Sequence, residues 1–113
     1  MKFLDNDKII EAFKFRHACK EFDGSKSVSE GDFRTILEAG RLSPSSFGFE
    51  PWKFLVLKSK EIRQKIYGVT WGGQDALQNA SEFVVILARV GADLHPQSEY
   101  LSYMMKEVKG LDE

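Results

Sequence analysis

The sequence has 113 residues, which is the length of one domain or less and excludes two independent domains. Hydrophobic residues make up 42% of it, with nine Phe and two Trp, so the chain has enough apolar volume for a core and is not disordered throughout. The 16 Lys and Arg against 17 Asp and Glu give a net charge of -1, which leaves no basic field to attract nucleic acid.

The chain begins with a predicted helix and an extended connection. Asp7 can cap a helix that ends near Phe15, because the apolar residues between them recur at helical spacing. Residues 16–22 show no clear period and lead into a turn at residues 23–25. We therefore expect residues 16–22 to form an extended connection that is dense in charge.

A second helix and an aromatic loop come next. Ser29 and Asp32 have the spacing of a capping box, and the apolar positions after them predict a helix over about residues 29–42. Pro44 stops this helix. The loop over residues 45–51 contains two phenylalanines besides Ser, Gly and Pro, so it has more apolar side chains than a simple turn needs.

A first strand and a third helix follow the loop. Residues 52–57 form a short apolar run between Pro51 and Lys58, which predicts a strand. Ser59 can then cap a helix, and the residues expected on its core-facing side are Ile62, Ile66 and Val69.

The last part of the sequence contains a second strand between two helices. A short helix or turn is expected over about residues 75–79, and the apolar run 83–88 lacks alternation, which predicts a central strand covered on both faces. Asp93 or His95 can cap a final helix with Pro96 in its first turn, and this helix has an apolar stripe formed by Leu101, Met104, Met105 and Val108.

Only two strands are predicted, and two strands alone make a poor sheet because three or more are normally needed for independent stability. The number of elements therefore indicates part of a larger fold, or a chain that completes its sheet with a partner.

Cys19 is the one cysteine, so an internal disulfide is impossible, and no set of Cys and His residues has zinc-site spacing. A lone intracellular cysteine is usually a small buried residue, and the two histidines are 78 positions apart, so we expect no nucleophile and no metal site. The first ten residues do not resemble a signal peptide, and no apolar run approaches the roughly 18 residues of a membrane span. These features predict a cytoplasmic protein that does not bind a membrane.

Arg16, His17 and Lys20 place two fixed cations and one titratable ring within five residues of a non-helical segment. Such a cluster can hold an anion, because Arg matches phosphate with a planar fork and Lys supplies a compact charge. The alternative is a solvated connection whose cations pair with nearby acids such as Glu21 and Asp23.

Two further segments are candidate binding sites. Residues 42–52 combine hydroxyls and free backbone N–H groups with aromatic side chains, as ligand sites do. The alternative is a helix stop and a strand start whose aromatics belong to the core. A weaker candidate is the segment 71–74, in which Gln74 offers both a donor and an acceptor.

Taken together, these segments resemble the amino-terminal half of the nitroreductase family. The resemblance rests on the order and spacing of RHACKEF from residue 16, LSPSSFGFEPWKF from residue 42, WGGQ from residue 71 and ASEFVVI from residue 80. Within the family the chain looks most like the oxygen-insensitive NAD(P)H-dependent nitroreductases, whose first motif reads RHxxK. The resemblance runs from about residue 8 to the end of the chain.

The resemblance implies an α+β fold with three layers and a central mixed sheet, here truncated to about half. Residues 1–113 would be the amino-terminal part of a single FMN-binding domain, since family members run to about twice this length. It further implies an intertwined homodimer with FMN in two clefts at the subunit interface.

The family motifs also imply cofactor-binding roles for individual residues. Arg16 and His17 would hold the phosphate and ribityl end of FMN, and Lys20 would lie near the pyrimidine edge of the flavin. Ala18 occupies a position where many relatives have Ser, so one side-chain hydrogen bond to the cofactor is missing. The remaining positions implied are Pro44, Ser45 and Ser46, in a loop that reaches the partner's flavin, and Gln74 near the flavin ring.

Two departures from the family pattern lie in the same loop, because Gly48 and Glu50 stand where many members have Asn and Gln. The implied activity is transfer of reducing equivalents from NAD(P)H through FMN to a nitroaromatic, quinone or similar small acceptor. The cofactor does this chemistry, so no catalytic acid, base or nucleophile of the protein is expected. The alternative is a truncated noncatalytic domain that acts at most as an association module.

Overall fold

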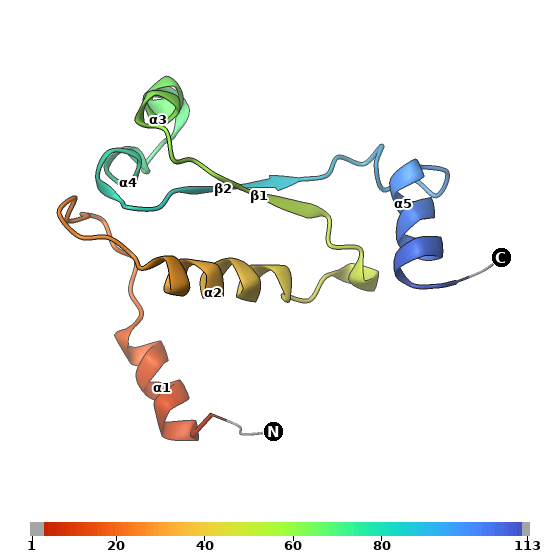
Figure 1. Cartoon of the computed structure of the whole chain (residues 1–113), viewed down its shortest axis with the longest axis horizontal. Helices are drawn as coiled ribbons and strands as arrows, with labels where there is room; N and C mark the ends of the chain where they lie inside the picture. The colour runs from red at the N-terminus through yellow and green to blue at the C-terminus, as the bar shows by residue number, and fades with distance from the viewer. Residues whose placement is uncertain (1–3, 112–113) are drawn as a thin grey trace.

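The structure is a computed structural model, and it describes residues 4–111. Helices and strands are mixed along the chain, which confirms the α+β class (Figure 1). The elements are α1 (Asn6–Phe15), α2 (Glu30–Arg41), β1 (Trp52–Val56), α3 (Lys60–Ile66), α4 (Gln74–Asn79), β2 (Val84–Ala88) and α5 (Glu99–Tyr103). Short 3-10 turns lie at Ser46–Gly48 and Tyr67–Val69, and α5 continues into a wider π-helical turn at Met104–Val108.

Side-chain caps fix where the helices begin. The Ser29 hydroxyl accepts the Asp32 N–H at 3.1 Å, and the Ser59 hydroxyl accepts the Ile62 N–H at 3.4 Å, as the sequence predicts. Ser29 also donates to the Asp32 carboxylate at 2.7 Å, which tightens the first turn of α2.

Two other caps differ from the prediction. Asp5 caps α1 by accepting the N–H of Asp7 at 2.9 Å, so Asp7 lies inside the first turn. Ser98 caps α5 by accepting the Leu101 N–H at 3.2 Å, so Asp93 and His95 precede the helix. In both cases the residue used is another good N-cap type close by, and periodicity alone does not choose between such neighbours.

The sheet consists of β1 and β2 in antiparallel pairing, with Trp52 opposite Ala88 and Val56 opposite Val84. Helix α2 runs along this pair (Figure 1), and Gly40 lies so close that a Cβ there would come within 2.9 Å of the Phe54 ring. The strand predicted over residues 83–88 forms, but it is not covered on both faces, because Ile86 is 66% exposed and only two strands are present in the described residues.

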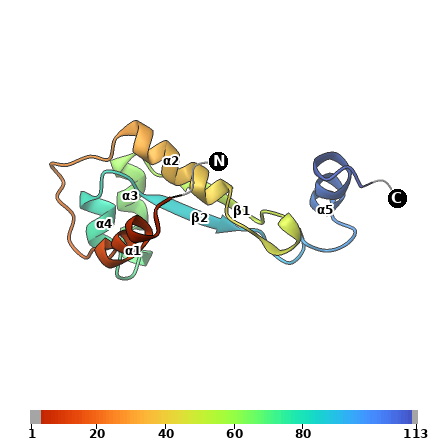
Figure 2. The same ribbon diagram turned by 90° about the horizontal axis from the view of Figure 1, so that it is seen from below.

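The described chain is open rather than compact. Its radius of gyration is 18.2 Å, whereas a compact domain of this length would have about 13 Å. Its accessible surface is 9776 Å², against roughly 6,300 Å² for a folded monomer of 12.9 kDa. Figure 2 shows α5 at one end of the sheet, far from α3 and α4 at the other. The buried hydrophobic side chains are Phe33, Leu57, Leu77 and Met104.

Helix α3 buries a residue that the hydrophobic pattern does not indicate. Ile62 is 47% exposed and Val69 is 81% exposed, so the predicted core-facing side is wrong at these two positions. Arg63 is the buried residue instead, and its guanidinium donates to the carbonyls of Leu57 at 2.7 Å, Ala80 at 2.6 Å and Ser81 at 3.1 Å. These three bonds tie α3 to the end of β1 and to the segment that precedes β2.

Within residues 4–111, none of the helices has both the length and the apolar character needed to cross a membrane.

Candidate functional site

The segment after α1 presents the predicted cations to solvent. Arg16 ends α1 with its N–H bonded to the Ala12 carbonyl at 3.0 Å, and its backbone is extended. The chain then runs to Phe22 without helix or strand, as predicted, and Arg16, His17, Ala18 and Lys20 are all exposed. Neither the arginine nor the lysine is used in packing the fold.

The nearby acids do not neutralise these cations. Asp23 accepts the Ser25 hydroxyl at 2.6 Å and the Ser25 N–H at 3.0 Å, and these hydrogen bonds lower the pKa of its carboxyl group. Its ion pair, at 3.5 Å, is with Lys26. Within residues 4–111, no carboxylate lies within ion-pair distance of Arg16 or Lys20. The alternative of a charge-paired connection therefore finds no support in Asp23.

The backbone N–H groups of the same segment are also available to a ligand. In the part of the chain that the structure describes, the N–H groups of residues 17–21 have no hydrogen-bond partner. Cys19 is exposed rather than buried, and its thiol donates to the Glu21 carbonyl at 2.9 Å. Cationic side chains and free backbone N–H groups are the kinds of donor that bind phosphate.

A tertiary hydrogen bond holds the end of this segment. The Phe22 N–H donates to Asp75 Oδ2 at 2.9 Å, and the Val28 N–H donates to the Ser81 hydroxyl at 3.1 Å. Gln74, the half-buried first residue of α4, precedes Asp75 directly. The structure therefore brings residues 16–22 and Gln74 to the same end of the molecule.

The loop with Pro44, Ser45 and Ser46 lies at the opposite end of α2. Both Figure 1 and Figure 2 show α2 running between the two sites. A helix of 12 residues is about 18 Å long. One chain therefore does not bring the two predicted sets of cofactor residues together.

The loop itself has an unusual backbone. Phe47, Gly48 and Glu50 have φ values of 53°, 63° and 46°, in the left-handed region that favours glycine. Each of the two non-glycine residues costs about 1 kcal/mol or more there, and such strain concentrates at functional sites. The alternative interpretation of this loop requires its aromatic side chains to lie in the core, but Phe47 is 81% exposed. The Ser45 hydroxyl accepts the Glu50 N–H at 2.9 Å and closes the loop.

Helix α5 supports the loop from outside. The Tyr100 hydroxyl donates to the Phe49 carbonyl and lies 3.2 Å from the Glu50 carbonyl. The Arg89 guanidinium stacks over the Tyr100 ring, with its carbon 3.5 Å from the ring centre. Sequence reasoning missed both residues, because Tyr100 contacts the loop from at least 50 positions away along the chain and Arg89 contacts Tyr100.

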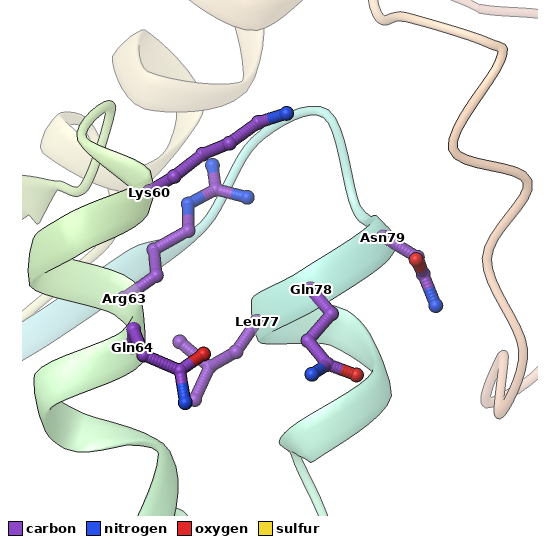
Figure 3. Close-up of a pocket in the computed structure, with 6 residues that line it drawn as sticks. All are labelled: Lys60, Arg63, Gln64, Leu77, Gln78 and Asn79. Carbon is purple, nitrogen blue, oxygen red and sulfur yellow. The ribbon is translucent and has the colours of Figure 1, made fainter.

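A hollow of about 240 Å³ lies between α3 and α4 (Figure 3). Its lining is mostly polar and contains none of the predicted cofactor residues: Lys60, Arg63, Gln64, Leu77, Gln78 and Asn79. The Arg63 guanidinium there is engaged by three carbonyls, so we assign it to the fold rather than to a ligand.

A family profile and the curated relatives that match this chain carry the same family name. Residues 13–107 match the profile of the Nitroreductase family. A protein of Staphylococcus saprophyticus that carries the name of an NAD(P)H nitroreductase is 52% identical over 105 residues, which are 93% of this chain and 47% of that protein. The chain thus spans about half the length of the curated relatives it matches.

Solved structures share the fold at low sequence identity. A nitroreductase-like protein from Streptococcus mutans superimposes with a TM-score of 0.68 at 17% identity, over 94% of this chain and 49% of that one. A nitroreductase from Exiguobacterium sibiricum, solved in complex with FMN, gives a TM-score of 0.63 at 20% identity, over 99% of this chain and 50% of that one. The nitroreductase-like α+β fold, present to about half its length, is thereby confirmed.

Proposed function

The chain belongs to the nitroreductase family, and on that premise we propose that it forms the amino-terminal part of an FMN-dependent oxidoreductase. The enzyme would take reducing equivalents from NAD(P)H and pass them to a nitroaromatic, quinone or similar small acceptor. When bound, the flavin supplies the hydride chemistry. The observation that carries the proposal is the unpaired donor set of residues 16–21, located on the first family motif.

The chain's own residues would bind and orient the cofactor. Arg16 and His17 would hold the phosphate and ribityl end, and the fixed charge of Lys20 would lie at the pyrimidine edge, where reduced flavin is negative. Gln74 would supply a neutral donor and acceptor near the ring. The exposure of Arg16 and Lys20, with no acid paired to either in residues 4–111, fits an anionic ligand.

We also propose a homodimer with the flavin at the subunit interface. The separation of the two cofactor sets along α2 supports it, because Pro44, Ser45 and Ser46 of one chain can serve the flavin held by residues 16–20 of its partner. The exposed apolar surface supports it as well, since an open chain of this kind needs other polypeptide to cover it. The cytoplasmic location stays a prediction from the sequence.

The competing proposal is a noncatalytic association module, and the same exposed apolar surface is what favours it. Bound flavin separates the two, because an association module has no need of one. We use the term completed protein for the chain joined to whatever follows Glu113 in its gene. If the gene ends there, the chain is joined to the second half of the Staphylococcus saprophyticus relative.

Arg16→Ala in the completed protein is expected to weaken FMN binding. A charge-assisted contact to phosphate contributes roughly 1.5–3 kcal/mol, which corresponds to about 10- to 150-fold in affinity. Titration with FMN, followed by flavin fluorescence, measures the loss. Arg34→Ala is the matched control, because it removes the same charge from an exposed i,i+4 pair with Glu30. Unchanged affinity in a folded Arg16→Ala variant would refute the phosphate assignment.

Lys20→Gln is expected to lower the flavin midpoint potential, because the lost charge favours reduced flavin over oxidised flavin. Two charges in contact interact with roughly 1–4 kcal/mol outside a dry interior, which gives a shift on the order of tens of millivolts for a two-electron couple. Spectroscopic redox titration measures it, and Lys20→Arg, which keeps the charge, should stay near wild type. A potential equal to or above wild type in Lys20→Gln would place Lys20 away from the flavin.

A further inference from the structure

We propose that Asp75 is a positioning residue for the cofactor: its carboxylate fixes the segment of Arg16, His17 and Lys20 against the start of α4. This inference rests on the proposed function, since it concerns the same FMN site. Nothing in the family motifs assigns a role to Asp75, and its contact crosses 53 positions of sequence.

Both carboxylate oxygens of Asp75 are engaged. Oδ2 accepts the N–H of Phe22 at 2.9 Å, and Oδ1 accepts the side-chain amide of Asn79 at 2.7 Å. Asn79 lies one turn further along α4, so the second bond fixes the carboxylate on its own helix. The first bond can then hold the backbone of Phe22 at a defined place.

The segment has little else to hold it near the cations. Helix α1, from which it leads, has no buried residue among Asn6–Phe15. The N–H groups of residues 17–21 have no partner within residues 4–111, and no side chain from another element bonds to these residues there. The bond to Asp75 is therefore the nearest tertiary restraint on Lys20, which is two residues before Phe22.

The same helix start also carries Gln74. Because Gln74 and Asp75 are adjacent in the first turn of α4, a short path that includes the Phe22–Asp75 hydrogen bond links Lys20 to the polar residue proposed near the flavin ring. Preorganising a segment in its bound conformation improves affinity by reducing the entropy lost on binding. The role of Asp75 is thus to accept a hydrogen bond, and its negative charge would by itself oppose an anionic ligand.

The experiment compares three variants of the completed protein by FMN titration and by hydrogen exchange of the peptides that cover residues 16–22. Asp75→Ala removes the acceptor, and we expect about tenfold weaker FMN binding with faster exchange in those peptides before flavin is added. Asp75→Asn keeps an acceptor oxygen, and Asn79 can turn its amide to match, so both readouts should stay close to wild type. Ser81→Ala removes the comparable tie at Val28, further from the cations, and should leave FMN affinity unchanged.

Each other result overturns the inference. Equal FMN affinity in Asp75→Ala and wild type would show that the restraint does not serve the cofactor. Tighter binding in both Asp75 variants would show that the charge, and not the hydrogen bond, is what matters. An equal loss of FMN affinity in Ser81→Ala would show that Asp75 only stabilises the loop in general and does not position the cofactor residues. Failure of the wild-type protein to bind FMN would instead overturn the proposed function, and it is seen before any variant is made.

Discussion

Residues 1–113 expressed alone are expected to show a broad or absent thermal transition and to be colourless after desalting. The described residues bury only four hydrophobic side chains and expose 9776 Å² of surface, against roughly 6,300 Å² for a folded monomer of this mass. At about 25 cal/mol per Å², a few hundred Å² of missing apolar burial removes several kcal/mol, which is comparable with a total stability of about 5–15 kcal/mol.

The unpaired edges of the sheet further lower the stability expected for the isolated chain. Strands β1 and β2 pair only with each other in the described residues, so their outer edges leave backbone donors and acceptors open and favour self-association. Calorimetry and light scattering of the isolated chain, with the completed protein as control, check the expectation. A sharp cooperative melt of a monomer with one FMN bound per chain would contradict it.

Arg63→Met in the completed protein is expected to lower the free energy of unfolding by about 3–5 kcal/mol. The methionine keeps most of the side-chain volume but removes the donors that serve the carbonyls of Leu57, Ala80 and Ser81. Those acceptors lie at the end of β1 and in the segment that precedes β2, so losing their donors loosens the attachment of α3 to both. Chemical denaturation measures the change.

Arg34→Met provides the matched control for this variant. Arg34 forms an ion pair with Glu30 at 2.6 Å, but its side chain is 77% exposed, so the loss should stay below about 1 kcal/mol. If Arg63→Met unfolds at the same denaturant concentration as Arg34→Met, then Arg63 does not anchor α3.

Local signals in the sequence predicted most of the secondary structure. Ser29 and Ser59 each cap the helix that follows them by accepting the N–H of the residue three positions later. Both partners of the hydrogen bond therefore lie within one short sequence motif. Asp5 and Ser98 were missed because a second good cap stands nearby, and the choice depends on the path of the entering chain. The missing cover on residues 83–88 has a different origin: a run of apolar residues does not say which segments pack over a strand, and Ile86 is 66% exposed in the described residues.

The residues of the candidate site also fall into two groups: those that a sequence motif locates and those that only tertiary contacts reveal. The motif residues Arg16, Lys20 and Gln74 could be located from their order and spacing, and the structure shows that they lie on one end of the molecule. Asp75, Arg63 and Tyr100 could not, because each acts through contacts with backbone atoms that no residue type marks in the sequence. A buried arginine that bonds only to carbonyls looks, in sequence, like any exposed cation of a helix.

The central claim is that this chain supplies the FMN site of an oxidoreductase, and the visible spectrum of the purified completed protein tests it most directly. After desalting, we expect flavin absorption corresponding to about one FMN per chain, and loss of that absorption when NAD(P)H is added without oxygen. A colourless protein that also fails to bind added FMN would contradict the claim.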